Sequence, residues 1–140
     1  MKVKICLTGT QPITLNHSHK ITTRGKFTTK YKTKEYVQFE SLVASKMRLY
    51  KAECNKLNKH FDEKIHCLHV DYRFYYPILT KKGIISKTSK DVDNCIKTTQ
   101  DSIFKSFLFD DSFITRVTAE KIHADKPSIE ICVTILTYRQ

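Results

Sequence analysis

Apolar and polar residues alternate along several stretches of this chain, and this period of two is typical of β-strands with one buried face. Strands are expected over residues 2–8, 65–76, 113–122 and 128–138. Pro77 ends the second of them, because proline cannot continue a sheet ladder. The last two strands are separated only by residues 123–127, so we expect them to form a hairpin.

Two further segments place apolar residues three or four positions apart, which indicates amphipathic helices. The first runs from about Lys34 to Lys56 and the second from about Asp91 to Phe107. The element order is therefore strand, helix, strand, helix, strand, strand. It predicts an α+β fold with a mixed sheet of about four strands and two helices packed on it. At 140 residues, the whole chain, 1–140, is expected to form a single domain.

The chain is strongly basic, with 25 Lys and Arg against 14 Asp and Glu and a formal net charge of +11. An excess of this size favours a polyanionic partner, and nucleic acid before a membrane, although a well-solvated lysine-rich surface is the simpler alternative. Two segments, 8–34 and 80–90, are rich in cations and turn formers and are expected to be loops. Their candidate DNA-binding residues are Lys20, Arg24, Lys26, Lys30, Lys32, Lys81, Lys82, Lys87 and Lys90.

The cysteines indicate the compartment rather than a metal site. Five are scattered along the chain without a CxxC pair, which is typical of reduced thiols in a cytoplasmic protein. His17 and His19 have no Cys or His partners near them in sequence, so a zinc site there is not expected. No apolar run has the length of a signal peptide or a membrane span, and we expect no membrane association.

One acidic region stands out against this basic background. Asp91 and Asp93 begin the second predicted helix, Lys97 and Asp101 follow on the same face, and the pair Asp110-Asp111 precedes the next strand. Aspartates at a helix start are ordinary caps, each contributing about 0.5–1 kcal/mol. The spacing of four also makes Lys97 and Asp101 a natural ion pair. Whether Asp111 returns to the start of the helix is not decided by spacing.

If these carboxylates converge, they provide the hard oxygen ligands that Mg²⁺ prefers. A bound Mg²⁺ could activate water and neutralise charge on a phosphodiester, while a lysine stabilises the transition-state oxygens. The reaction predicted from this set of residues is phosphodiester hydrolysis.

The acidic segment resembles the signature of the RusA family of Holliday-junction resolvases. The resemblance is carried by Asp91-Val-Asp-Asn-Cys-Ile-Lys97, then Asp101, then Asp110-Asp111. A looser likeness extends over the N-terminal half. Lys97 lies one residue closer to the aspartate pair than the family pattern has it, which leaves open whether Asp110 or Asp111 faces the metal. We favour Asp111.

This resemblance implies a metal-dependent endodeoxyribonuclease that resolves four-way junctions and related branched DNA by paired symmetric nicks in recombination and repair. It implies Asp91, Asp93 and Asp111 as ligands of Mg²⁺, for which Mn²⁺ can substitute, and Lys97 as the catalytic cation. It also implies a homodimer, because a two-fold protein presents two identical sites to a junction with approximate two-fold symmetry.

Two other hypotheses remain open from the sequence. In the first, the chain is a non-catalytic basic nucleic-acid-binding protein whose aspartates cap and brace a helix. In the second, the same positive charge serves an RNA-directed enzyme or a ribosome-associated protein.

Overall fold

The computed structural model describes residues 1–138 and confirms the α+β class. Its helices are α1 (Lys34–Met47), α2 (Lys51–His60) and α3 (Val92–Ile103). Its strands are β1 (Lys2–Thr8), β2 (His19–Arg24), β3 (Phe27–Lys32), β4 (His66–Tyr76), β5 (Ile114–His123) and β6 (Ser128–Thr137). Short 3₁₀ turns lie at η1 (Leu15–His17), η2 (Arg48–Tyr50), η3 (Phe104–Ser106) and η4 (Asp111–Phe113).

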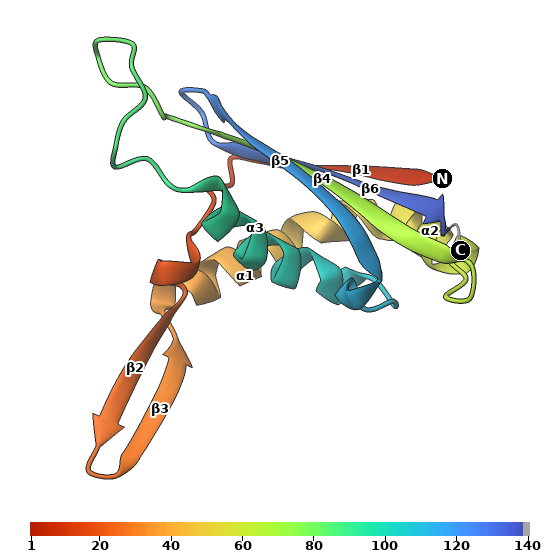
Figure 1. Cartoon of the computed structure of the whole chain (residues 1–140), viewed down its shortest axis with the longest axis horizontal. Coiled ribbons are helices and arrows are strands. Elements are labelled where there is room, and N and C mark those ends of the chain that lie inside the picture. The colour runs from red at the N-terminus through yellow and green to blue at the C-terminus, as the bar shows by residue number, and fades with distance from the viewer. Residues whose placement is uncertain (139–140) are drawn as a thin grey trace.

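Four strands form a mixed sheet in the order β1-β6-β4-β5, and the helices lie against one of its faces (Figure 1). Alternate residues of the strands point into the layer between sheet and helices, as the period of two predicts. In β4 these are Leu68, Val70, Tyr72, Phe74 and Tyr76, all buried. The opposite face carries polar side chains, including Asp71 and Arg73 of β4. The domain therefore has two layers with one hydrophobic core between them.

The predicted C-terminal hairpin is wrong. β4 lies between β5 and β6, pairing antiparallel with β6 and parallel with β5. The parallel pair is joined through α3, so β4, α3 and β5 form a strand–helix–strand crossover. As a consequence, β5 begins beside the beginning of β4 and ends beside its end, with Leu68 opposite Ile114 and Tyr76 opposite His123.

The first predicted helix is broken in two. A 3₁₀ turn, η2, separates α1 from α2, although the apolar positions predicted for one stripe, among them Phe39, Met47 and Cys54, are buried. The second predicted helix is shorter than expected, because α3 ends at Ile103 and the chain continues as η3. Ile103 and Phe107 are buried as expected, and Ile96 is partly buried. The buried face of α3 also includes Cys95 and three small hydroxyl residues.

The prediction of a loop over residues 8–34 is wrong for residues 19–32. Residues 19–32 form an antiparallel two-stranded hairpin, here called the arm, that projects away from the domain (Figure 1). Gly25 turns the arm with a φ of +60°, a conformation that glycine adopts at no steric cost. The segment is as polar as its composition indicates, and nearly all its side chains are exposed.

Within residues 1–138, no helix has the length and apolar character needed to cross a bilayer. All five cysteines carry free thiols, in agreement with the sequence-based expectation. Burial raises the pKa of both Cys54 and Cys95 to about 11, so these two thiols stay protonated near neutral pH. They serve as small apolar side chains of the core.

Candidate active site

Asp91 and Asp93 lie exposed at the beginning of α3, which we call the helix start. Asp91 occupies the N-cap position with an extended backbone, but its carboxylate accepts no capping hydrogen bond. Asp93 follows within the first turn. The positive end of the helix dipole favours both charges. Neither carboxylate is used to cap the helix, so their oxygen atoms are available to a cation. The hypothesis that these aspartates serve as helix caps is therefore weaker than it was from the sequence alone.

Hydrogen bonds connect the helix start to the C-terminal ends of β4 and β5. The hydroxyl of Tyr76 donates a 2.6 Å hydrogen bond to the carbonyl oxygen of Lys90. The ammonium group of Lys121 donates to the same carbonyl at 3.3 Å and to the hydroxyl of Ser89 at 2.9 Å. Lys121 was absent from the sequence-based candidates. It occupies an alternating position in β5 that places it on the α3 side of the sheet, which is the one signal that could have identified it.

Lys97 lies one turn further along α3 and forms an ion pair with Asp101 at 2.9 Å. This confirms the predicted role of Asp101 as the partner that holds Lys97. The hydrogen bond to Asp101 raises the pKa of Lys97, and the charge of Asp111 acts in the same direction. Lys97 therefore remains a cation at neutral pH, and its ammonium group is exposed to solvent.

Asp110 and Asp111 differ in environment. Asp110 caps η4 by accepting a 2.7 Å hydrogen bond from the backbone N–H of Ser112, and the hydrogen bonds from Ser112 lower the pKa of Asp110. Asp110 also lines a surface pocket with Asp62 and Glu63. Asp111 makes no such cap. This difference favours Asp111 as the residue of the pair that is available for another role.

The structure does not bring Asp111 to the helix start. Asp111 opens η4 just before Ile114, which lies beside Leu68 near the beginning of β4, whereas the helix start is bonded to Tyr76 at the end of β4. Burial raises the pKa of Tyr76 to about 12, and among the acids it is Asp91 that adds to the effect. Burial also raises the pKa of Tyr72, in the middle of β4, but there the contributing acids are Asp101 and Asp111. Among residues 1–138, no group of three Asp, Glu, His or Cys side chains is arranged to hold a metal ion. One chain thus presents two carboxylates at the helix start and a third elsewhere.

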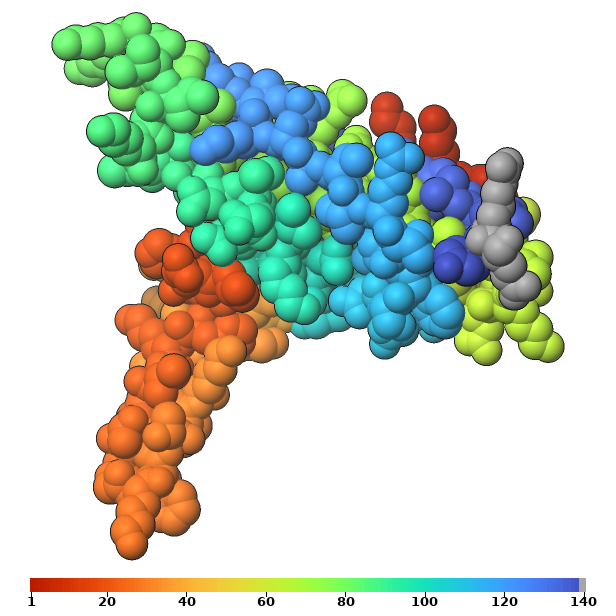
Figure 2. Space-filling model, viewed as in Figure 1, coloured from red at the N-terminus to blue at the C-terminus, as the bar shows by residue number. Residues whose placement is uncertain are grey.

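Two basic segments lie on either side of the helix start. The arm carries Lys20, Arg24, Lys26, Lys30 and Lys32. The loop of residues 77–90, here called the basic loop, carries Lys81, Lys82 and Lys87, all exposed, and ends at Lys90. Figures 1 and 2 show that both project from the end of the molecule where α3 begins, with an open recess between them. The cations predicted to bind DNA therefore flank Asp91 and Asp93.

The two faces of the arm differ in chemistry. Arg24 pairs across the strands with Phe27, and Lys20 pairs with Tyr31, so one face combines both aromatic rings with two cations. Phe27 is 79% exposed. An exposed aromatic ring next to cations is suited to stacking on a nucleobase while the cations contact phosphates. Packing against the core does not account for a ring that is so exposed.

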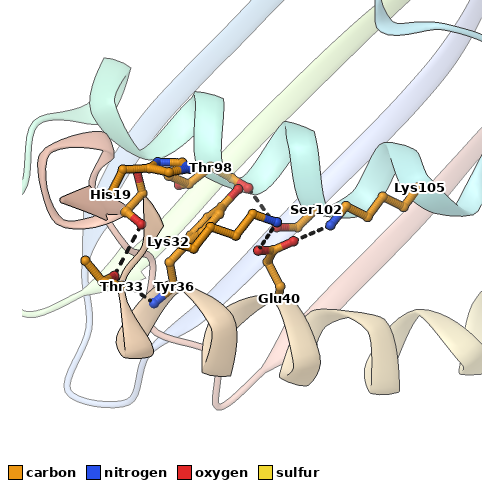
Figure 3. Close-up of polar contacts among 9 residues, drawn as sticks. His19, Lys32, Thr33, Tyr36, Glu40, Thr98, Ser102 and Lys105 are labelled. Carbon is orange, nitrogen blue, oxygen red and sulfur yellow. Dashed lines mark hydrogen bonds and ion pairs between the residues drawn. The ribbon is translucent and has the colours of Figure 1, made fainter. Parts of the chain in front are cut away.

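The base of the arm is held by charge (Figure 3). Glu40 of α1 pairs with Lys32 at 2.8 Å and also with Lys105, which follows α3. Although burial opposes it, the hydrogen bonds from Lys105 and Lys32 lower the pKa of Glu40. Thr33 caps α1 by accepting from the N–H of Tyr36 and donates its hydroxyl to the carbonyl of His17. These contacts set the direction in which the arm leaves the domain.

A comparison with protein-family models matches residues 11–134 to the family Endodeoxyribonuclease RusA. This chain belongs to the RusA family. The match spans the arm, the basic loop, α3 and most of the sheet, and it agrees with the resemblance carried by the segment Asp91–Asp111. A search of curated proteins finds no match. RusA membership implies an endodeoxyribonuclease that acts on branched DNA.

Proposed function

We propose that this RusA-family protein is a divalent-metal-dependent endodeoxyribonuclease that resolves four-way DNA junctions by paired symmetric nicks, acting as a homodimer. The observation that supports this most is the helix start. Two exposed carboxylates that cap nothing lie between two basic projections of a protein with a net charge of +11. A DNA backbone held by the cations would pass directly over the carboxylates.

The residues of the helix start fit a hard divalent cation. Mg²⁺ commonly takes one or two protein carboxylates and completes its shell with water and substrate phosphate. Asp91 and Asp93 would be the ligands from this element. When bound, the cation would neutralise developing charge on the phosphodiester and lower the pKa of an attacking water. Asp111 is proposed as a further ligand, and Asp110 is a weaker candidate because its carboxylate already caps η4.

Lys97 is proposed as the catalytic cation. Its ion pair with Asp101 limits the positions of the ammonium group without burying it, since the Lys97 side chain is 54% exposed. It lies on α3 one turn beyond Asp93, so it can donate to a phosphate oxygen of a backbone bound at the helix start. Tyr76 and Lys121 would act as positioning residues, because they hold the Lys90 carbonyl and with it the first turn of α3.

The basic segments would provide binding without cleavage. The arm and the basic loop offer cations to phosphates on two sides, and the arm adds Phe27 and Tyr31 for unstacked bases. In the open form of a four-way junction, the base pairs at the crossover lack a stacking neighbour that they would have within an intact duplex. This arrangement therefore favours branched DNA over a linear duplex.

Incubation with a synthetic four-way DNA junction tests the proposed function. With Mg²⁺ or Mn²⁺, we expect symmetric nicks in two opposing strands, and with EDTA we expect binding without nicks. A linear duplex of the same sequence and a matched RNA junction should be cut far more slowly. Absence of nicks in the DNA junction with either metal would contradict the proposal, and preferential cutting of the RNA junction would favour an RNA-directed enzyme.

A further inference from the structure

A surface pocket of about 500 Å³ lies between the bases of the arm and the basic loop. Its lining comes from residues 9–17, from α1 and from Lys90, the last residue of the basic loop. Residue 17 lies just before the arm, and Lys90 directly precedes Asp91, so the pocket borders the helix start. Its volume lies within the range of about 300–1,000 Å³ that is typical of ligand sites.

The lining of this pocket has the composition that a nucleobase requires. One part is apolar and consists largely of Pro12, Phe39 and Leu42. Beside it lie side chains that form hydrogen bonds, the amides of Gln11 and Gln38 and the carboxylate of Glu35. Proteins hold a base that has left the helical stack through apolar contacts with its faces and hydrogen bonds to its polar edge. The pocket offers both kinds of contact.

A smaller pocket of about 190 Å³ adjoins the first, and Gln11 and Lys90 line both of them. Its other lining residues include three with hydroxyl groups, Ser86, Thr88 and Ser89. The ammonium group of Lys90 lies 5.6 Å from the centre of the Tyr76 ring, and this cation–π contact limits its positions. Lysine and hydroxyl side chains are common phosphate contacts. The two pockets together therefore match one nucleotide, with its phosphate in the smaller pocket and its base in the larger.

The larger pocket is built against the helix that carries the aspartates. The hydroxyl of Thr98, on α3, donates a buried 2.6 Å hydrogen bond to the carbonyl oxygen of Ile13 in the pocket lining. The hydroxyl of Thr14 and Nδ1 of His17, also in the lining, form a second hydrogen bond of 2.6 Å. These bonds hold the pocket in place relative to α3. A base bound in it would fix the position of its own backbone beside Asp91.

We propose that the two pockets bind one nucleotide of the branched substrate, turned out of the helical stack, and that its base occupies the larger pocket next to the cleaved bond. The inference rests on the proposed nuclease function and adds to it a site that selects a base. Turning a base out of the stack is least costly where pairing or stacking is already weakened, as at the crossover of an open junction.

The carboxylate of Glu35 determines which bases are preferred. Among the lining residues that the structure describes, Glu35 is the only acid. A carboxylate only accepts hydrogen bonds, so it favours a base with an exocyclic amino group, which adenine, cytosine and guanine have. Thymine lacks this group and presents carbonyl oxygens, which a carboxylate repels. We therefore expect thymine to be the least favoured base at this position.

The fluorescence of 2-aminopurine tests whether a base enters the pocket. This adenine analogue carries an amino group and emits more strongly outside the helical stack. It is placed at one position at a time around the crossover of a four-way DNA junction, which is then saturated with protein in EDTA. We expect the emission to rise at least about threefold at one position of a strand. The double variant Gln11→Ala/Gln38→Ala, measured at saturation, should lose this rise.

A rise that persists in the double variant would show that the junction opens without using the pocket, and it would overturn the proposal. The absence of a rise at every position would overturn it as well. Because the fluorescence is measured without a nick, a failure of the proposed function is distinguishable. A protein that shows the pocket-dependent rise but does not cut with Mg²⁺ contradicts the proposed function and leaves the nucleotide site supported.

Single-turnover nicking tests the choice of base. Thymine at the position identified by fluorescence should slow the wild type about tenfold relative to the other three bases. In Glu35→Gln, whose amide can donate to a carbonyl oxygen, the difference should fall below about threefold. Glu53→Gln makes the same change at an exposed residue in the first turn of α2 and should keep the wild-type preference. Equal rates with all four bases in the wild type, or an unchanged preference in Glu35→Gln, would contradict the assignment.

Discussion

Asp93→Asn is expected to lower the rate of nicking of a four-way junction by at least about 100-fold. The substitution keeps the size of the side chain but replaces a charged ligand by a neutral amide. Metal catalysis of this kind stabilises the transition state by several kcal/mol, and about 1.4 kcal/mol corresponds to a factor of ten. Single-turnover cleavage with saturating protein measures the effect separately from DNA binding.

The control for Asp93→Asn is Glu53→Gln, which removes one exposed carboxylate from the first turn of α2, an element outside the proposed site. It should nick at the wild-type rate. Junction affinity should be unchanged or slightly higher in Asp93→Asn, because the substitution removes a negative charge near the DNA backbone. Undiminished nicking in Asp93→Asn would remove this residue from the proposed chemistry.

Replacing Arg24, Lys26 and Lys30 of the arm together by Ala is expected to weaken junction binding about 100-fold near 0.1 M salt. Removal of one cation that binds a phosphate should reduce the slope of log affinity against log salt by about one, so the slope should fall by about three. The side chains are exposed on a projecting hairpin, so the free energy of unfolding should change little. Fluorescence anisotropy at several salt concentrations measures both the affinity and the slope, and urea unfolding measures the stability.

A triple variant of α2, with Lys51, Lys56 and Lys59 replaced by Ala, is the matched control. It loses the same formal charge from the exposed face of a helix that lies away from the arm and the basic loop (Figure 1). Its salt slope should stay close to the wild-type value. Equal slopes for the two triple variants would show that net charge, and not the arm, determines binding.

The spacing of apolar residues correctly predicted those strands and helices that bury one face in the core. The alternation in β1, β4 and β6 and the stripe of α1 follow from one face of each element packing into the core. The strands of the arm could not be predicted in this way, because their side chains are almost all exposed and show no apolar alternation. They depend on a glycine turn and on β-branched residues, and composition alone made residues 19–32 resemble a loop.

The location of Asp111 depended on topology rather than on local pattern. The predicted hairpin of β5 and β6 excluded a parallel pairing of β4 with β5. Two strands connected by a helix usually lie parallel in the same sheet. Had residues 66–123 been interpreted as such a unit, the parallel direction of β5 would have placed Asp111 at the end of α3 remote from Asp91. The residues of the acidic motif were identified from the sequence. The separation of Asp111 from Asp91 within one chain became known only from the order of strands in the sheet.

The aspartates at the helix start are proposed to bind a catalytic metal rather than to cap a helix. Calorimetric titration of the DNA-free protein with Mn²⁺ tests this most directly, with Asp91→Asn measured alongside the wild type. We predict saturable Mn²⁺ binding to the wild type and its loss in Asp91→Asn. The free energy of unfolding in urea should fall by no more than about 1 kcal/mol, because Asp91 makes no capping hydrogen bond and its charge interacts only with the helix dipole. No Mn²⁺ binding to the wild type, or undiminished binding to Asp91→Asn, would contradict the account.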